Sequence, residues 1–169
     1  MERTVRVAEP DDADGIASVH VRSWRAAYRG VVSDDFLDNL SIANRALAWR
    51  ELLADAEQRT FVVESNGAIV GFSAAGPTRD PFAETATGEV YAMYVDPDVW
   101  GRGIGSSLLA RAVADLRGRG YTAATLWVLV ENDQARRFYE RHGWQVEGAR
   151  QTYPIGEAEL EEIRYRIEL

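Results

Sequence analysis

The chain has 169 residues, 46% of them hydrophobic, which predicts a single domain over residues 1–169 with room for an apolar core. It has no cysteine, and all 19 basic residues are arginines; this excludes disulfides, thiolate metal sites, acyl-cysteine or Schiff-base intermediates and the lysine of a nucleotide-triphosphate loop. The net charge of -8 argues against nucleic-acid binding, and with neither a leader nor about 18 consecutive apolar residues we expect a soluble cytoplasmic protein without a membrane partner.

The N-terminal segment predicts a strand followed by two helices. Over residues 3–8 valines alternate with arginines, the period of a half-buried strand, and Pro10-Asp11-Asp12 has the composition of a helix start. In that helix every fourth residue falls on one face, which suits either the core or the wall of a substrate site: Ile16, His20, Trp24 and Tyr28. Gly30 ends the pattern, and a second helix is predicted over residues 41–54.

The middle of the chain predicts a hairpin and then a central strand. Residues 60–64 and 68–75 are rich in β-formers, and the Asn66-Gly67 step between them favours a tight turn. A loop rich in proline, threonine and glycine follows over residues 76–88. Residues 89–95 are then almost continuously apolar, as in a strand covered on both faces.

The second half predicts a crossover between two parallel strands. After a glycine-rich turn comes a helix with a broad apolar stripe, at Ile104, Leu108, Leu109, Ala112, Val113 and Leu116. A buried strand over 122–130, a short helix over 132–142 and strands over 144–148 and 163–169 complete the order. The segment 89–130 therefore requires a parallel pair within a mostly antiparallel sheet, which places the chain in the mixed α/β (α+β) class.

The turn over residues 95–105 joins a buried strand to a helix N-terminus and suits an anion. Its glycines let backbone N–H groups converge without side-chain obstruction, and the helix dipole adds positive charge, so a pyrophosphate is the natural ligand. The dinucleotide fingerprint fails because position 106 is serine, and the triphosphate loop fails for lack of a lysine. A purely structural strand-to-helix turn is the alternative.

Two motifs then carry a resemblance to a known family. Trp100-Gly101-Arg102-Gly103-Ile104-Gly105 resembles the acyl-CoA signature of the GNAT superfamily of N-acetyltransferases, with Trp100 where a glutamine or arginine is usual. The block from Asn132 through Phe138-Tyr139 to Gly143-Trp144 resembles a later motif of the same family. The resemblance implies a mixed sheet in which the strands at 89–95 and 122–130 splay apart.

The resemblance also implies roles for individual residues. It places acetyl-CoA contacts at Met93, Tyr94, Val95, Trp100, Gly101, Arg102, Gly103, Ile104, Gly105, Ser106, Asn132 and Tyr139. It implies that the Met93 amide stabilises the oxyanion and that the Tyr139 hydroxyl protonates the leaving thiolate, although periodicity alone would put Tyr139 in the core. Glu89 is the candidate general base, with a water chain as the alternative if Glu89 is only a solvated strand end. Asn132 is also a good helix N-cap.

The predicted activity is therefore acetyl transfer from acetyl-CoA to a primary amine by direct attack. The acceptor is unidentified: we expect a small molecule or a peptide, with a small molecule favoured over a protein, and the negative charge suits a cationic amine. A CoA-binding sensor without turnover is the alternative function, and a scaffold that binds no CoA is a third. Two distant histidines and no cysteines predict no metal site, and the resemblance suggests a homodimer.

Overall fold

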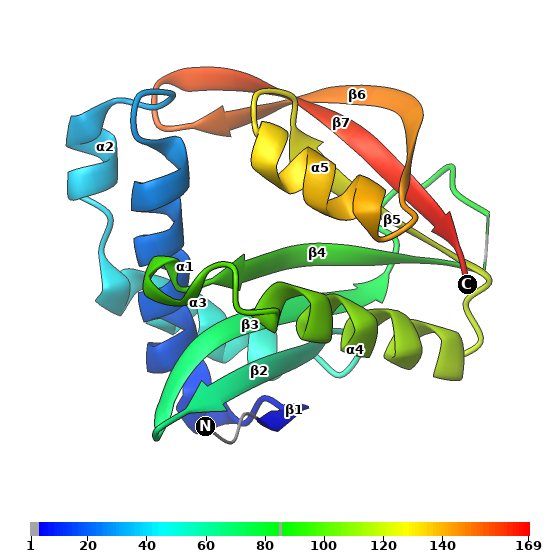
Figure 1. Cartoon of the computed structure of the whole chain (residues 1–169), viewed down its shortest axis with the longest axis horizontal. Coiled ribbons are helices and arrows are strands. Elements are labelled where there is room, and N and C mark those ends of the chain that lie inside the picture. Colours follow the sequence, from blue (N-terminus) through cyan, green and yellow to red (C-terminus); the bar gives the residue numbers. More distant parts are fainter. Residues whose placement is uncertain (1–3, 85) are drawn as a thin grey trace.

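The computed structural model, which describes residues 4–84 and 86–169, is a twisted seven-stranded sheet with helices on both faces (Figure 1). The strand order is β1-β2-β3-β4-β5-β7-β6. The elements in chain order are β1 (Thr4–Val7), η1 (Pro10–Asp12), α1 (Ala13–Tyr28), α2 (Asp34–Asp38), α3 (Ile42–Leu53), β2 (Arg59–Ser65), β3 (Ala68–Pro77), β4 (Thr87–Val95), η2 (Pro97–Val99), α4 (Ile104–Gly118), β5 (Ala123–Leu129), α5 (Asp133–Arg141), β6 (Gln145–Ile155) and β7 (Ala158–Glu168).

Strand β2 shows how the two faces of the sheet are covered. Val62 packs with α1 and α3, whereas its neighbours Phe61 and Val63 pack with α4 on the opposite face. This follows from the alternation of side chains along a strand. Beyond β4, α4 and α5 share a second core with β5 and β7 that includes Leu116, Tyr139 and Tyr165. None of the helices in the described residues is long and apolar enough to cross a bilayer.

Strands β4 and β5 are parallel and then diverge, which confirms the predicted fold class. They pair over three residues, Thr87 to Glu89 against Ala123 to Thr125. Immediately afterwards the register of β4 with β3 skips Tyr91, because Ala74 pairs with Ala92 and Ala75 with Val90. A bulge of this kind bends its strand. Figure 1 shows β4 and β5 starting together near the C-terminus and separating along their length.

Most predicted elements are present, and the predicted Asn66-Gly67 turn is confirmed because both residues have positive φ, 53° and 78°. The last two strands were predicted too short: β6 and β7 form a long hairpin that fills the unassigned residues 149–162. The unassigned residues are largely polar and exposed, so they lack the apolar alternation that predicts a strand. The five-residue helix α2 was not predicted. Arg3, in the predicted first strand, and Thr85, in the predicted loop, lie outside the described residues.

Candidate active site between two clefts

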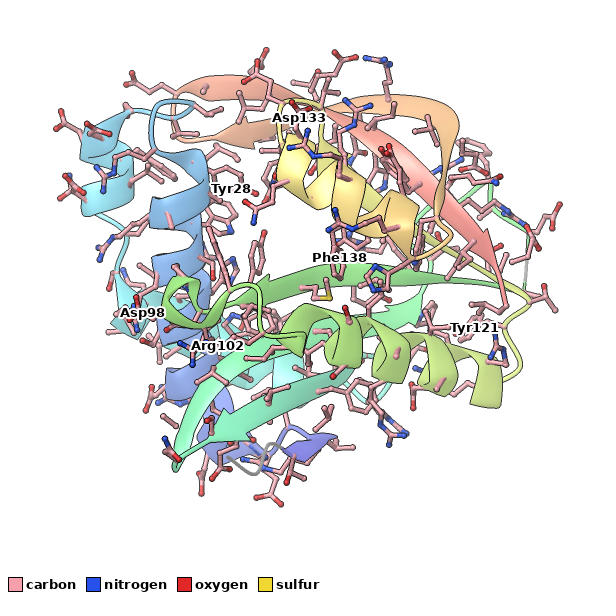
Figure 2. All side chains as sticks on the ribbon, viewed as in Figure 1. Tyr28, Asp98, Arg102, Tyr121, Asp133 and Phe138 are labelled. Atoms are coloured by element: carbon pink, nitrogen blue, oxygen red, sulfur yellow. The ribbon has the colours of Figure 1, made fainter. Side chains whose placement is uncertain are left out.

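Two clefts meet where β4 and β5 separate. The first, about 510 Å³, lies toward α4 and α5, and all the predicted acetyl-CoA contacts except Arg102 line it. The second, about 750 Å³, is lined by β4, β5, β6 and β7, by α1 and by the loop after β3. The residues common to both are Tyr28, Met93, Tyr94, Asn132, Ala135 and Tyr139. Figure 2 shows Tyr28 on the side of α1 that faces α5, and Phe138 pointing from α5 toward α4.

The backbone of β4 presents polar groups to the gap. The Asp96 N–H donates to the Val70 carbonyl at 2.9 Å while Val95 lies opposite Gly71, so Val95 is at a non-hydrogen-bonded position of the ladder with β3. Met93, two residues earlier and opposite Ser73, has the same setting. The N–H and C=O groups of Met93 and Val95 therefore point away from β3 and toward β5. In the gap these groups need a ligand, a side chain or water as their hydrogen-bond partner.

The glycine turn leaves the start of α4 open. Gly101 and Gly103 both have positive φ, 75° and 78°, and a Cβ atom on either would meet no atom within 4 Å. The first turn of α4 contains no acidic residue. Free N–H groups, the positive end of the helix dipole and open space are the features that a phosphate group needs. The residues of this turn therefore fit the diphosphate of a coenzyme.

Ion pairs to α1 hold the preceding turn in place. Arg22 donates to the carboxylates of Asp96 and Asp98, each at 2.6 Å. The Asp96 side chain also accepts a hydrogen bond from the Asp98 N–H at 3.0 Å and so caps η2. The turn is thereby tied to the helix that contributes Tyr28 to both clefts.

Trp100, which departs from the family motif, has a structural role that its sequence position did not indicate. Its indole N–H donates to the Val95 carbonyl at 2.7 Å, and the Ser23 hydroxyl donates to the same oxygen at 3.0 Å. One of the backbone groups that face the gap is therefore satisfied by the protein itself. The side chain remains 39% exposed at the edge of the α4 cleft, where it forms part of the wall.

Helix α5 closes the other side of this cleft. The Asn132 side chain caps it by accepting from the Ala135 N–H at 3.0 Å, as predicted. Phe138 reaches Gly105, where a Cβ atom would lie 3.4 Å from the Phe138 ring. His142 bridges the two helices, with Nε2 3.0 Å from the Ser106 hydroxyl and Nδ1 2.8 Å from the Phe138 carbonyl. Neither contact of His142 was expected from the sequence.

Tyrosines occupy the point where the clefts join. Tyr139 is 8% exposed, and burial, together with nearby Tyr94, raises the pKa of its hydroxyl. Burial likewise raises the pKa values of Tyr28 and Tyr94. These phenols therefore stay protonated over the physiological range and can act as proton donors. Tyr139 belongs to the core cluster and also lines both clefts, so its two predicted settings are compatible.

Glu89 lies in the second cleft but is not a solvated strand end. It is 2% exposed, and both of its oxygens accept hydrogen bonds from Arg79: Oε2 from the backbone N–H at 2.8 Å and Oε1 from the guanidinium at 2.5 and 3.1 Å. Its carboxylate is therefore already engaged. This arrangement favours the water-chain alternative for removing the proton from an amine.

The helix face that carries His20, Trp24 and Tyr28 is core, and two of these residues also form cleft wall. His20 accepts a hydrogen bond from the Trp49 indole at 3.1 Å and stacks on Tyr94 with ring centroids 5.0 Å apart. Burial, with a smaller contribution from Arg45, lowers the pKa of His20 to about 3. Trp24 and Tyr28 line the second cleft.

Glu162 of β7 lines the second cleft and was not predicted as a site residue. It lies just before the strand predicted over residues 163–169, so the predicted elements did not assign its side chain to either face of the sheet. The alternation of Glu162 and Arg164 with buried Ile163 and Tyr165 was the available signal. Within the described residues there is no group of three or more histidine or acidic side chains that could hold a metal ion.

Comparison with known proteins identifies the family. The model of the "Acetyltransferase (GNAT) family" matches residues 20–144. The uncharacterized N-acetyltransferase YuaI of Bacillus subtilis is 32% identical over 130 residues, 76% of this chain and 73% of the relative. The probable N-acetyltransferase Rv2775 of Mycobacterium tuberculosis is 26% identical over 166 residues, 96% of this chain and 92% of the relative.

Solved structures show the same fold at low sequence identity. The PaiA N-acetyltransferase of Thermoplasma acidophilum, in complex with coenzyme A, aligns over 100% of both chains with a TM-score of 0.79 and 17% identity. YncA of Salmonella typhimurium, a putative acetyltransferase with its cofactor acetyl-CoA, aligns over 99% of this chain and 94% of its own with a TM-score of 0.75 and 22% identity. On its sequence motifs, its split sheet and these matches, the chain belongs to the GNAT family of acetyltransferases.

Proposed function

We propose that this protein transfers an acetyl group from acetyl-CoA to a primary amine by direct attack, without a covalent enzyme intermediate. The observation that carries the proposal is that two clefts meet at a shared set of residues, which includes Met93 and Tyr139. One cleft ends at the open N-terminus of α4, which suits a diphosphate. The other is the space left for an acceptor.

The chain's own residues divide the chemistry as follows. The backbone N–H groups at residues 102–106 hold the diphosphate, and the outward groups of Met93 and Val95 align the pantetheine arm along β4. Acetyl-CoA supplies the activated acyl group as a thioester. The Met93 N–H stabilises the negative charge that develops on the carbonyl oxygen during attack. The Tyr139 hydroxyl gives its proton to the departing sulfur.

The amine must lose a proton before it can attack, because an alkylamine has a pKa near about 10.4 and is protonated at neutral pH. Glu89 is one candidate for this step and a chain of waters in the second cleft is the other. The hydrogen bonds that Glu89 already accepts from Arg79 support the second route. In that case Glu89 serves to fix the loop after β3 against β4.

The test compares two tyrosine-to-phenylalanine variants in a thiol-release assay with acetyl-CoA and a panel of amines. Tyr139→Phe should lower kcat by about 100-fold or more, the range expected for a lost general acid, while calorimetry shows unchanged acetyl-CoA affinity. Tyr121→Phe is the matched control, because Tyr121 lies outside both clefts, beyond the end of α4 (Figure 2). Unchanged turnover in Tyr139→Phe would remove Tyr139 from the mechanism.

The alternative, a CoA-binding sensor without turnover, predicts a different result. Such a module would give heat on titration with acetyl-CoA and no thiol release with any amine of a broad panel. If acetyl-CoA gives no heat on titration and no amine gives thiol release, both functions are excluded and a scaffold that binds no CoA is left.

A further inference from the structure

Among the described residues that line the second cleft, one carboxylate makes no ion pair with an arginine. Arg79 is paired with Glu89, Arg164 with Asp80, and Arg150 with the exposed Glu161. Glu162 is different: it accepts a hydrogen bond from the Gln151 side-chain amide at 2.7 Å, and no arginine of the described residues comes within ion-pair distance of it. A cation brought by a ligand would meet its charge in this position.

The surroundings of Glu162 place it close to the junction of the clefts. It is partly buried, and burial raises the pKa of its carboxyl group. Arg79 and Glu89 act electrostatically on the Glu162 carboxyl, and the charge of Glu162 helps to raise the pKa values of the Tyr28 and Tyr94 hydroxyls. The paired residues Asp80, Arg150 and Arg164 line the same cleft. Tyr28 and Tyr94 line both clefts. An ammonium bound by Glu162 would therefore lie beside the place where we put the thioester.

The walls of the same cleft are rich in aromatic side chains. Eight aromatic residues line it: Trp24, Tyr28, Phe82, Tyr91, Tyr94, Trp127, Tyr139 and Tyr153. Phe82, on the loop after β3, is 95% exposed and Tyr153 is 39% exposed, so the rim offers apolar contact to an entering molecule. Aromatic faces attract cations and flat apolar groups. A linear polyamine would need several carboxylates without paired arginines, whereas the described residues of the cleft offer one, Glu162, which favours a ligand with a single ammonium group.

We propose that Glu162 binds the ammonium group of the acceptor and accepts its proton, and that the acceptor is a monoamine with an aromatic or other flat apolar body. This inference rests on the proposed acetyl transfer. Glu162 thereby takes the part that sequence reasoning gave to Glu89, and Glu89 keeps its place in the ion pair with Arg79.

The proton and electron balance of the step is complete. The ammonium gives one proton to the Glu162 carboxylate, and the freed lone pair on nitrogen forms the C–N bond to the acetyl carbon. The C–S bond breaks with its electron pair going to sulfur, which takes a proton from Tyr139. The nitrogen loses its second proton, which restores Tyr139 through the cleft water, and Glu162 releases its own proton to solvent. The sum is an ammonium and a thioester giving an amide, a thiol and one proton.

The first arm of the experiment uses the unmodified full-length chain. Thiol release is measured with acetyl-CoA and four amines: 2-phenylethylamine, spermidine, alanine and a short peptide. We expect kcat/KM for 2-phenylethylamine to exceed the others at least about tenfold, since a difference of one well-made apolar contact is worth that much. A preference for spermidine, alanine or the peptide would overturn the assigned acceptor class.

The second arm compares Glu162→Gln with Glu159→Gln, a control in the same strand that is exposed and outside both clefts. Glu162→Gln should lower kcat/KM about 100-fold at pH 7. Its kcat/KM should recover toward that of the unmodified enzyme as the pH approaches the pKa of the amine, because the amine then loses its proton to solvent. The unmodified enzyme should show an acid limb above 4.5, the ordinary value for this carboxyl, because burial raises the pKa of Glu162. Glu162→Asp, which keeps the charge, should retain more activity than Glu162→Gln and guards against a misfolded variant.

The outcomes separate the two proposals. If amines are acetylated and Glu162→Gln stays within threefold of the unmodified enzyme at every pH, the role of Glu162 is refuted while the transferase stands. If no amine releases thiol although calorimetry shows acetyl-CoA bound, the transferase itself is refuted and the assignment of Glu162 with it. A lowered kcat/KM in Glu162→Gln with unchanged acetyl-CoA affinity supports both.

Discussion

His20 predicts a measurable loss of stability in mild acid. Burial lowers its pKa from the ordinary value of 6.5 to about 3, so the folded protein keeps the imidazole neutral where the unfolded chain takes up a proton. Between those two values the unfolded state binds more protons than the folded state, and the free energy of unfolding must fall as the pH falls. Stability is complete above 6.5 and is lost as the pH drops toward the folded pKa.

The size of the effect follows from the same two values. At pH 5 a group with a pKa of 6.5 in the unfolded chain and about 3 in the folded protein costs about 2 kcal/mol of stability relative to pH 7. The full difference of about 5 kcal/mol is reached only below pH 3. Because the His20 ring accepts a hydrogen bond from the Trp49 indole, protonation of the accepting nitrogen would also break that buried hydrogen bond.

Urea unfolding at pH 7 and pH 5 measures the effect. His20→Asn keeps an acceptor for the Trp49 indole but cannot take up a proton, so it should lose about 2 kcal/mol less than the unmodified protein between the two pH values. His142→Asn is the control, because that histidine is exposed. Equal pH dependence in the unmodified protein and in His20→Asn would refute the reasoning.

Two further predictions concern the cleft walls. Gly103→Ala forces a left-handed residue to carry a Cβ, which costs about 1–2 kcal/mol, so the acetyl-CoA affinity measured by calorimetry should fall about tenfold. Gly118→Ala is the control: this glycine has no positive φ and has open space around it, so the affinity should stay unchanged. An unchanged affinity in Gly103→Ala would contradict the role of the turn. Arg79→Met leaves the buried Glu89 carboxylate without its cation and should lower the free energy of unfolding, measured in urea, by about 2–3 kcal/mol. The double variant with Glu89→Gln should recover part of this loss, whereas additive losses of the two single variants would argue against the ion pair.

The sequence predicted the glycine turn and its neighbours because local rules decide them. Positive φ at Gly101 and Gly103 and the cap at Asn132 each follow from a few adjacent residues. The parallel strands on either side of α4 follow from the order of strand, helix and strand along the chain. The family motifs then pointed to the cleft that these elements line. All the residues predicted to contact acetyl-CoA except Arg102 line that cleft.

The parts that the sequence did not reveal depend on pairing between distant segments. The setting of Glu89 is decided by Arg79 in a loop, and the setting of Trp100 by the direction in which the Val95 carbonyl points. Glu162 belongs to a cleft assembled from α1, four strands and a loop, and the alternation of its strand does not show which of these elements its side of the sheet meets. Periodicity cannot place such a residue, because its neighbours in space are set by the register of the sheet.

The three residue pairs that join β4 to β5 have a mechanical consequence. They form the closed end of a wedge, and the wedge's angle sets the width available to anything held in its mouth. Gly88, in this seam, lies so near α4 that a Cβ atom there would come within 2.8 Å of the Leu116 side chain. Bulk added at the seam would therefore shift the mouth of the wedge, so residues that touch no substrate help to determine which molecules the enzyme can hold.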